Sequence, residues 1–134
     1  MARHVLNPMQ MRLFVDPEEH VQHIVGATDQ RHDETRESLF HRKEMETRDP
    51  DPPYPGSHGA GLYQSVKESG VLHPIQLLPA MDKSGWIQFE GHHRVAAARA
   101  VQRDTGRQQW VPVHYNTMTY PSEAQLVQHR KEID

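Results

Sequence analysis

The stretch Phe89-Glu90-Gly91-His92-His93-Arg94-Val95-Ala96-Ala97-Ala98 decides the fold, because it predicts a strand that ends, a glycine turn and a helix that begins. The first N–H groups of a helix lack intrahelical partners and lie at the positive end of its dipole. Gly91 has no Cβ, so the backbone can approach a ligand closely. Arg94 adds a guanidinium fork for a phosphate, and His92 and His93 add further donors. The stretch therefore predicts an anion-binding turn.

The sequence on either side of this turn predicts a small α+β domain with a short mixed sheet flanked by helices. Glycines at 70 and 106 are expected to end the helices that precede them, and Pro112 suggests an edge position for its strand. The predicted elements are helices over 61–69, 94–103 and about 122–131, strands over 75–78, 86–89 and 111–115, and a turn at 82–85.

A proline-rich segment separates two parts of the chain. Residues 49–57 hold four prolines, which suit neither a helix nor a central strand, so residues 49–58 are predicted to be an extended linker. Residues 1–48 are predicted to form a helical arm, and residues 59–134 the α+β domain. In the arm, Asp16 is a suitable N-cap and Pro17 a suitable first residue for a helix that Gly26 would stop.

The second predicted helix of the arm, over about 30–47, is highly charged. Its few apolar residues are Leu39, Phe40 and Met45. So thin an apolar stripe predicts weak docking, or docking against a partner protein or a second copy of the chain.

The composition excludes several classes of site. The 134 residues include no cysteine, which excludes disulfides, zinc–thiolate sites and thiol catalysis and suits a cytoplasmic protein. No apolar run is long enough for a membrane span, and the N-terminus lacks the pattern of a signal peptide. The net charge of −3 is not that of a strongly basic nucleic-acid binder.

Residues 59–115 resemble the ParB/sulfiredoxin superfamily. The resemblance rests on four separated elements in the order of the family: a helix with Gly70-Val71, then Pro74-Ile75, then Gly91-His92-His93-Arg94, and finally Val111-Pro112-Val113. ParB proteins carry Gly-Glu-Arg-Arg at the third element, and sulfiredoxins carry Gly-Cys-His-Arg. The resemblance implies a nucleotide-binding core of the ParB-like N-terminal type.

The resemblance also implies a set of nucleotide-binding residues. Gly91 and Arg94 match both families, and His93 matches the sulfiredoxin histidine that contacts phosphates with the arginine. His92 stands where sulfiredoxin has its catalytic cysteine, which excludes a sulfiredoxin-type reductase. The segment beside the nucleotide in ParB proteins corresponds here to Gly70, Pro74 and Gln76.

The function that this resemblance implies is binding of CTP or ATP, with Mg²⁺ as a companion ion, in DNA-related processes of a phage or mobile element. Only 19 residues follow Tyr115, and the ParB Glu-Asn-x-x-Arg motif is absent, so centromere-type DNA binding and a CTP-gated clamp are not expected. Weak hydrolysis of nucleotide or DNA stays open. Glu90 is the candidate catalytic residue, since it could position water or help to hold Mg²⁺, although an exposed strand end is the more ordinary role.

Two other functions stay open. A metal-dependent hydrolase could use His92 and His93 with His73 and His114, although adjacent histidines on a turn diverge. Alternatively, the fold could be kept in a non-enzymatic interaction protein that works through residues 1–48.

Overall fold

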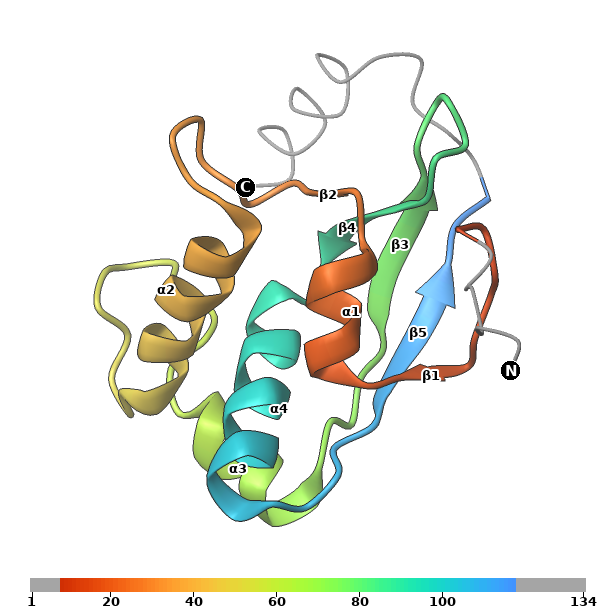
Figure 1. The fold of residues 1–134 in the computed structure, drawn as a ribbon. Coiled ribbons are helices and arrows are strands. Elements are labelled where there is room, and N and C mark those ends of the chain that lie inside the picture. Colours follow the sequence, from red (N-terminus) through yellow and green to blue (C-terminus); the bar gives the residue numbers. More distant parts are fainter. Residues whose placement is uncertain (1–7, 118–134) are drawn as a thin grey trace.

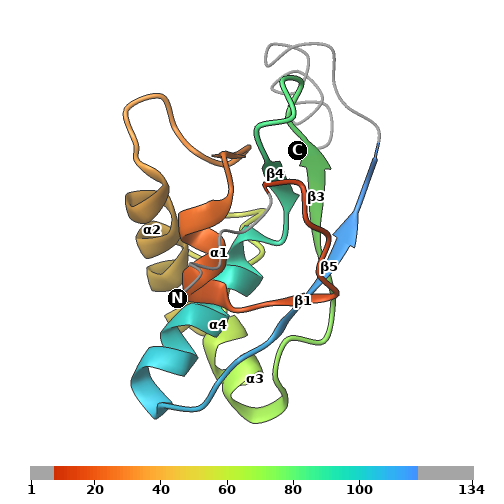
Figure 2. The same cartoon turned by 45° about the vertical axis from the view of Figure 1, so that its right-hand side comes forward.

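The computed structural model describes residues 8–117, which form a five-stranded mixed sheet with helices on one face (Figure 1). Figure 2 shows the helices gathered on one side of strands β3 and β5, with α4 next to the sheet and α2 outermost. The elements in chain order are β1 (Phe14–Val15), α1 (Pro17–His23), β2 (Gly26–Ala27), α2 (Arg36–Arg48), α3 (Leu62–Ser69), β3 (Ile75–Pro79), β4 (Trp86–Glu90), α4 (His92–Thr105) and β5 (Val111–Tyr115).

The sheet has the strand order β1-β5-β3-β4-β2. Strands β3 and β4 form the predicted antiparallel hairpin, and β5 lies parallel to β3. The two outer strands are only two residues long: β1 runs antiparallel to β5, and β2 runs parallel to β4. The predicted α+β class with a short mixed sheet is therefore confirmed.

The edge position predicted for β5 is wrong, because β1 covers its outer side. Val113 donates its N–H to the carbonyl of Leu13 at 3.1 Å, on the β1 side. On the other side, pairing with β3 begins only at Val113. Pro112 precedes that paired segment, so its missing N–H costs the sheet no ladder hydrogen bond.

Local signals placed most helix ends correctly. Asp16 caps α1, and its carboxylate accepts from the N–H of Glu19 at 2.9 Å. Gly70 and Gly106 end α3 and α4 as predicted. The stop predicted at Gly26 is wrong: α1 ends at His23, and Gly26 pairs with Ile87 in the sheet. The predicted helix over about 122–131 lies outside the described residues.

Residues 14–48 belong to the same core as the rest of the described chain. They supply both outer strands, and Leu39 and Phe40 are fully buried in the cluster that also holds Ile75, Val95 and Val101. These two apolar anchors of α2 are therefore covered within the chain. The weak docking expected from the thin apolar stripe is not what the structure has.

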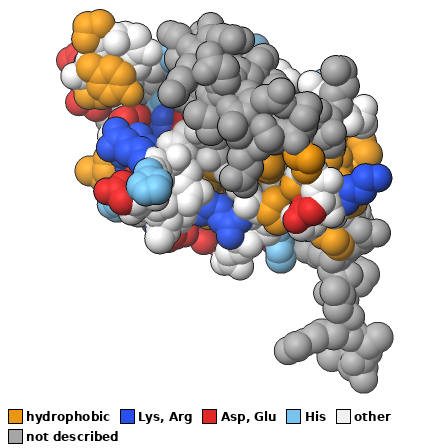
Figure 3. All heavy atoms as spheres, turned by 90° about the horizontal axis from the view of Figure 1, so that it is seen from above, with side chains coloured by type: hydrophobic (Ala, Val, Ile, Leu, Met, Phe, Trp, Pro, Cys, Tyr) orange, Lys and Arg blue, Asp and Glu red, His pale blue; other side chains and the backbone are white. Residues whose placement is uncertain are grey.

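The described part of the chain contains no helix long and apolar enough to cross a membrane. Figure 3 looks down on the fold from above and shows basic, acidic and histidine side chains interspersed over its coloured surface.

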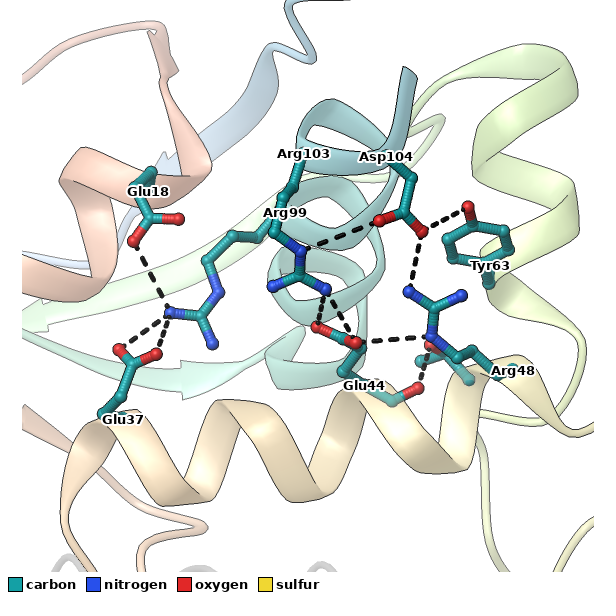
Figure 4. Close-up of polar contacts among 9 residues, drawn as sticks. Glu18, Glu37, Glu44, Arg48, Tyr63, Arg99, Arg103 and Asp104 are labelled. Carbon is teal, nitrogen blue, oxygen red and sulfur yellow. Dashed lines mark hydrogen bonds and ion pairs between the residues drawn. The ribbon is translucent and has the colours of Figure 1, made fainter. Parts of the chain in front are cut away.

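Charged side chains explain how so polar a helix as α2 docks. Glu44 of α2 is 4% exposed and accepts two hydrogen bonds from Arg103 of α4, at 2.8 and 2.9 Å. Arg99 of α4 is 3% exposed and donates to both carboxylate oxygens of Glu37 at 2.8 Å. Figure 4 shows how Asp104 extends this network to Arg48 and to the helix α3. The α2–α4 contact therefore combines two apolar anchors with hydrogen-bonded ion pairs.

Candidate anion site at the start of helix α4

Gly91 forms the predicted turn between β4 and α4. It is the N-cap of α4 in the left-handed conformation, with φ 88° and ψ 23°, and within residues 8–117 no side chain caps the helix. A Cβ at this position would lie 2.6 Å from Ile75 Cγ2. Glycine is therefore required by the backbone conformation and by the close approach of β3, and neither reason depends on a ligand.

Arg94 lies in the first turn of α4 and is half-buried. Its Nη1 donates to the carbonyl oxygen of Pro74 at 3.0 Å. Among the described residues it forms no ion pair, in contrast to Arg99 and Arg103 on the same helix. The guanidinium is thus anchored at one nitrogen by a neutral acceptor, and its charge is not neutralised by a carboxylate.

Several other predicted site residues lie near the end of the sheet where β4 leads into Gly91 and α4. Pro74 immediately precedes β3, and Gln76 is paired in register with Glu90, the last residue of β4. Glu90 is exposed and directly precedes the Gly91 turn. Gly70 ends α3, four residues before Pro74 in the same connecting segment.

The side chain of His92 points away from this end of the sheet and toward α2. It is 3% exposed, and its Nδ1 lies 3.1 Å from Asp29 Oδ2, which is also 2.8 Å from Lys43 Nζ. The His92 ring lies near Phe40, with 6.2 Å between ring centroids. The side chain of His92 is thus part of the contact between α4 and α2. Only the backbone of His92 contributes to the first turn of α4.

His93 also contacts α2. Its Nε2 lies 2.6 Å from Glu46 Oε2, and a Cβ on Gly59 would meet its ring at 2.3 Å. Burial lowers the pKa of His93, and the hydrogen bond to Glu46 opposes that shift only in part. Among the three side chains of the motif, that of Arg94 is therefore the one with no carboxylate partner in the described chain.

The described residues contain no group of three His, Asp or Glu side chains that could hold a metal ion. His92 and His93 turn toward two different carboxylates, Asp29 and Glu46. His73 and His114 are exposed. In the part of the chain that is described, the histidine cluster considered from the sequence does not come together.

A pocket that sequence reasoning missed lies elsewhere, against α1. His20 and Trp86 line it, and both are more than nine-tenths buried. One signal was present in the sequence: His20 stands on the buried face of α1 with Pro17, Val21 and Ile24, at helical spacing. A histidine inside an apolar stripe marks a polar group that folding places in the interior.

Comparisons with protein-family models, with curated proteins and with solved structures return no match for this chain.

Proposed function

We propose that this protein binds a nucleotide, CTP or ATP, by its phosphate groups at the first turn of α4, with Arg94 as the charged contact. The observation that carries the proposal is the state of Arg94: beside an uncapped helix start, its guanidinium donates to a carbonyl oxygen and has no acidic partner among the described residues. A helix N-terminus with an adjacent arginine offers both backbone donors and a charge to a phosphate.

The contrast with the neighbouring arginines supports a role for Arg94 outside the fold. Arg99 and Arg103 each donate two hydrogen bonds to a glutamate and hold α4 against its neighbours. Arg94 instead projects from the same helix at the end of the sheet, next to Pro74. A phosphate that accepts from its remaining N–H groups would neutralise the charge.

The rest of the nucleotide would lie along the segment that leads into β3, where Gly70, Pro74 and Gln76 are placed. The resemblance to ParB-like domains supports this placement of the nucleotide. Glu90 is the exposed carboxylate next to the phosphate position. It would help to hold a Mg²⁺ ion that arrives with the phosphates, or position a water molecule for hydrolysis.

Isothermal titration calorimetry with CTP, ATP, GTP and ADP, each with Mg²⁺, tests the proposal. Cytidine and adenosine serve as matched controls, because they keep the base and ribose but lack the phosphates. We expect saturable heat from at least one triphosphate and none from its nucleoside. Equal affinity for a triphosphate and its nucleoside would contradict a phosphate site, and no heat from any nucleotide would contradict the proposed function.

Release of inorganic phosphate from the bound nucleotide separates a hydrolase from a binding module. If the wild type turns over nucleotide, Glu90→Gln should reduce the rate and leave the dissociation constant within about threefold, a difference of less than 1 kcal/mol. If binding occurs without turnover, the site acts as a nucleotide-binding module.

A further inference from the structure

One edge of the sheet carries exposed apolar side chains. Strand β1 is the last strand on this side, and the described part of the chain places no strand beyond it (Figure 1). Leu13 is 81% exposed and Phe14 of β1 is 54% exposed. Met11 and Trp110, which directly precedes β5, are also more than half exposed. Exposed apolar side chains that gather in one place on a folded protein mark an interaction surface.

The backbone of β1 keeps hydrogen-bonding groups for a further strand. Val113 donates its N–H to the carbonyl of Leu13 at 3.1 Å, so these two residues form a hydrogen-bonded pair of the antiparallel ladder. Such pairs alternate with pairs whose backbone groups point to the other side of the strand. The next pair in register is Phe14 with Pro112. The N–H and C=O groups of Phe14 are therefore directed at the free edge, away from β5.

This edge lacks the features that keep edge strands apart. Natural edge strands are protected by charged side chains, prolines or bulges. Residues 13–15 are Leu-Phe-Val, and the nearest charged residues, Arg12 and Asp16, stand at the two ends of this apolar run. An uncharged apolar edge with free backbone groups is a template for another strand.

We propose that two copies of this chain pair through their β1 strands, antiparallel, across a twofold axis at Phe14. Each Phe14 would donate its N–H to the carbonyl of the other Phe14. The exposed side chains of Met11, Leu13, Phe14 and Trp110 would supply the apolar contact on either side of the joined strands. The same surface patch then serves both copies, as a twofold interface requires.

The charges beside the strand favour a second copy as the occupant. Arg12 and Asp16 are each two residues from Phe14, so in the antiparallel pair Arg12 of one copy lies opposite Asp16 of the other. The carboxylate of Asp16 accepts from the N–H of Glu19 within its own chain, so it contributes to the pair as a charge. A folded copy also presents its strand already ordered, which costs less conformational entropy than ordering a free peptide.

The proposed dimer is small. One short strand and four side chains are fewer than the roughly 20–30 residues a side of a standard interface, so a reversible dimer with a micromolar or weaker dissociation constant is expected. The edge shares no residue with the turn at 91–94. The proposal therefore does not depend on the nucleotide site, and Arg94→Ala should dimerise as the wild type does.

Sedimentation equilibrium of the full chain, without nucleotide, from about 10 μM to 1 mM measures the association. We expect a monomer–dimer equilibrium. Phe14→Asp places two carboxylates opposite each other at the axis, so it should weaken the dimer about tenfold or more. Met81→Asp is the matched control, because Met81 is 61% exposed in the turn between β3 and β4, away from this edge; its dimerisation should equal that of the wild type.

The amide of Phe14 reports the strand pairing itself, and this measurement needs no variant. Hydrogen exchange of the ¹⁵N-labelled wild type should be about threefold or more slower at this amide at the high end of the concentration range than at the low end. A dimer held by side chains alone would leave the exchange rate unchanged. A monomeric mass over the whole range, equal dimerisation of Phe14→Asp and Met81→Asp, or an exchange rate independent of concentration would each overturn the proposal.

Discussion

Arg94 of α4 donates from Nη1 to the carbonyl oxygen of Pro74 at 3.0 Å, although the two residues are 20 positions apart. This contact ties the first turn of α4 to the segment before β3. The sequence shows only the order of these two elements, and the structure shows that they are in contact. Because the acceptor is a neutral carbonyl, the charge of Arg94 has no acidic partner in the described chain.

Replacing Arg94 with alanine should weaken nucleotide binding at least about tenfold and leave the fold intact. The expected loss of binding free energy is about 1.5–3 kcal/mol, the contribution of a charge-assisted hydrogen bond. Arg107→Ala is a matched control, because Arg107 also donates to a backbone carbonyl, that of Lys67 at 3.4 Å, beyond the other end of α4. Calorimetry that finds equal affinity in the two variants would place the nucleotide elsewhere.

Gly91→Ala should destabilise the protein more than Gly106→Ala. Both glycines have positive φ, 88° and 72°, so both substitutions incur the conformational cost of about 1–2 kcal/mol. Only the Cβ at Gly91 meets Ile75, at 2.6 Å, whereas that at Gly106 meets nothing within 4 Å. Overpacking should add about 1–3 kcal/mol at Gly91. Urea unfolding of the two variants measures the difference in their free energy of unfolding. Equal losses would mean that β3 moves away from the added Cβ at no energetic cost.

Glu44→Ala should loosen α2 from α4. The carboxylate is buried and accepts from both Arg103 and Arg48, so its removal should lower the free energy of unfolding by about 1.5–3 kcal/mol. Glu68→Ala is the control, since Glu68 is exposed and accepts only from Gln64 at 2.9 Å; a change within about 0.5 kcal/mol is expected there. Similar melting temperatures for the two variants would show that the ion pairs of α2 contribute little.

Stability should fall as the pH drops from 6.5 toward 4 because of His20. Its pKa is about 4 in the folded protein, against 6.5 for an exposed histidine, so in this range the unfolded chain takes up a proton that the folded protein does not. The contribution present above pH 6.5 should be lost progressively, by about 3 kcal/mol in total at about 1.4 kcal/mol per pH unit.

The variant His20→Gln, which keeps a polar side chain but cannot titrate, isolates this effect. Its free energy of unfolding should depend less on pH over this range than that of the wild type. His23→Gln, at a side chain that is 55% exposed, should keep the wild-type dependence. Parallel curves for the wild type and His20→Gln would show that the imidazole protonates without cost in the folded state.

The sequence by itself determined the local features. Asp16 and Pro17 begin α1, Gly91 begins α4, and Gly106 ends it, because caps and positive φ are set by residues within a turn of each other. The strands at 75–79, 86–90 and 111–115 were predictable for the same reason: each shows its own run of β-favouring residues between turn signals.

Tertiary structure alone decided how distant segments meet. The two-residue strands β1 and β2 have no sequence pattern of their own and exist because β5 and β4 offer free edges. The charged helix α2 docks because its partners Arg99 and Arg103 lie about 60 residues away in sequence. His92 and His93 are adjacent in the motif, but His92 pairs with Asp29 in the segment before α2 and His93 pairs with Glu46 of α2. Arg94 has neither partner and donates to Pro74 instead. Such contacts depend on side chains far apart in the chain, and a local pattern carries no information about them.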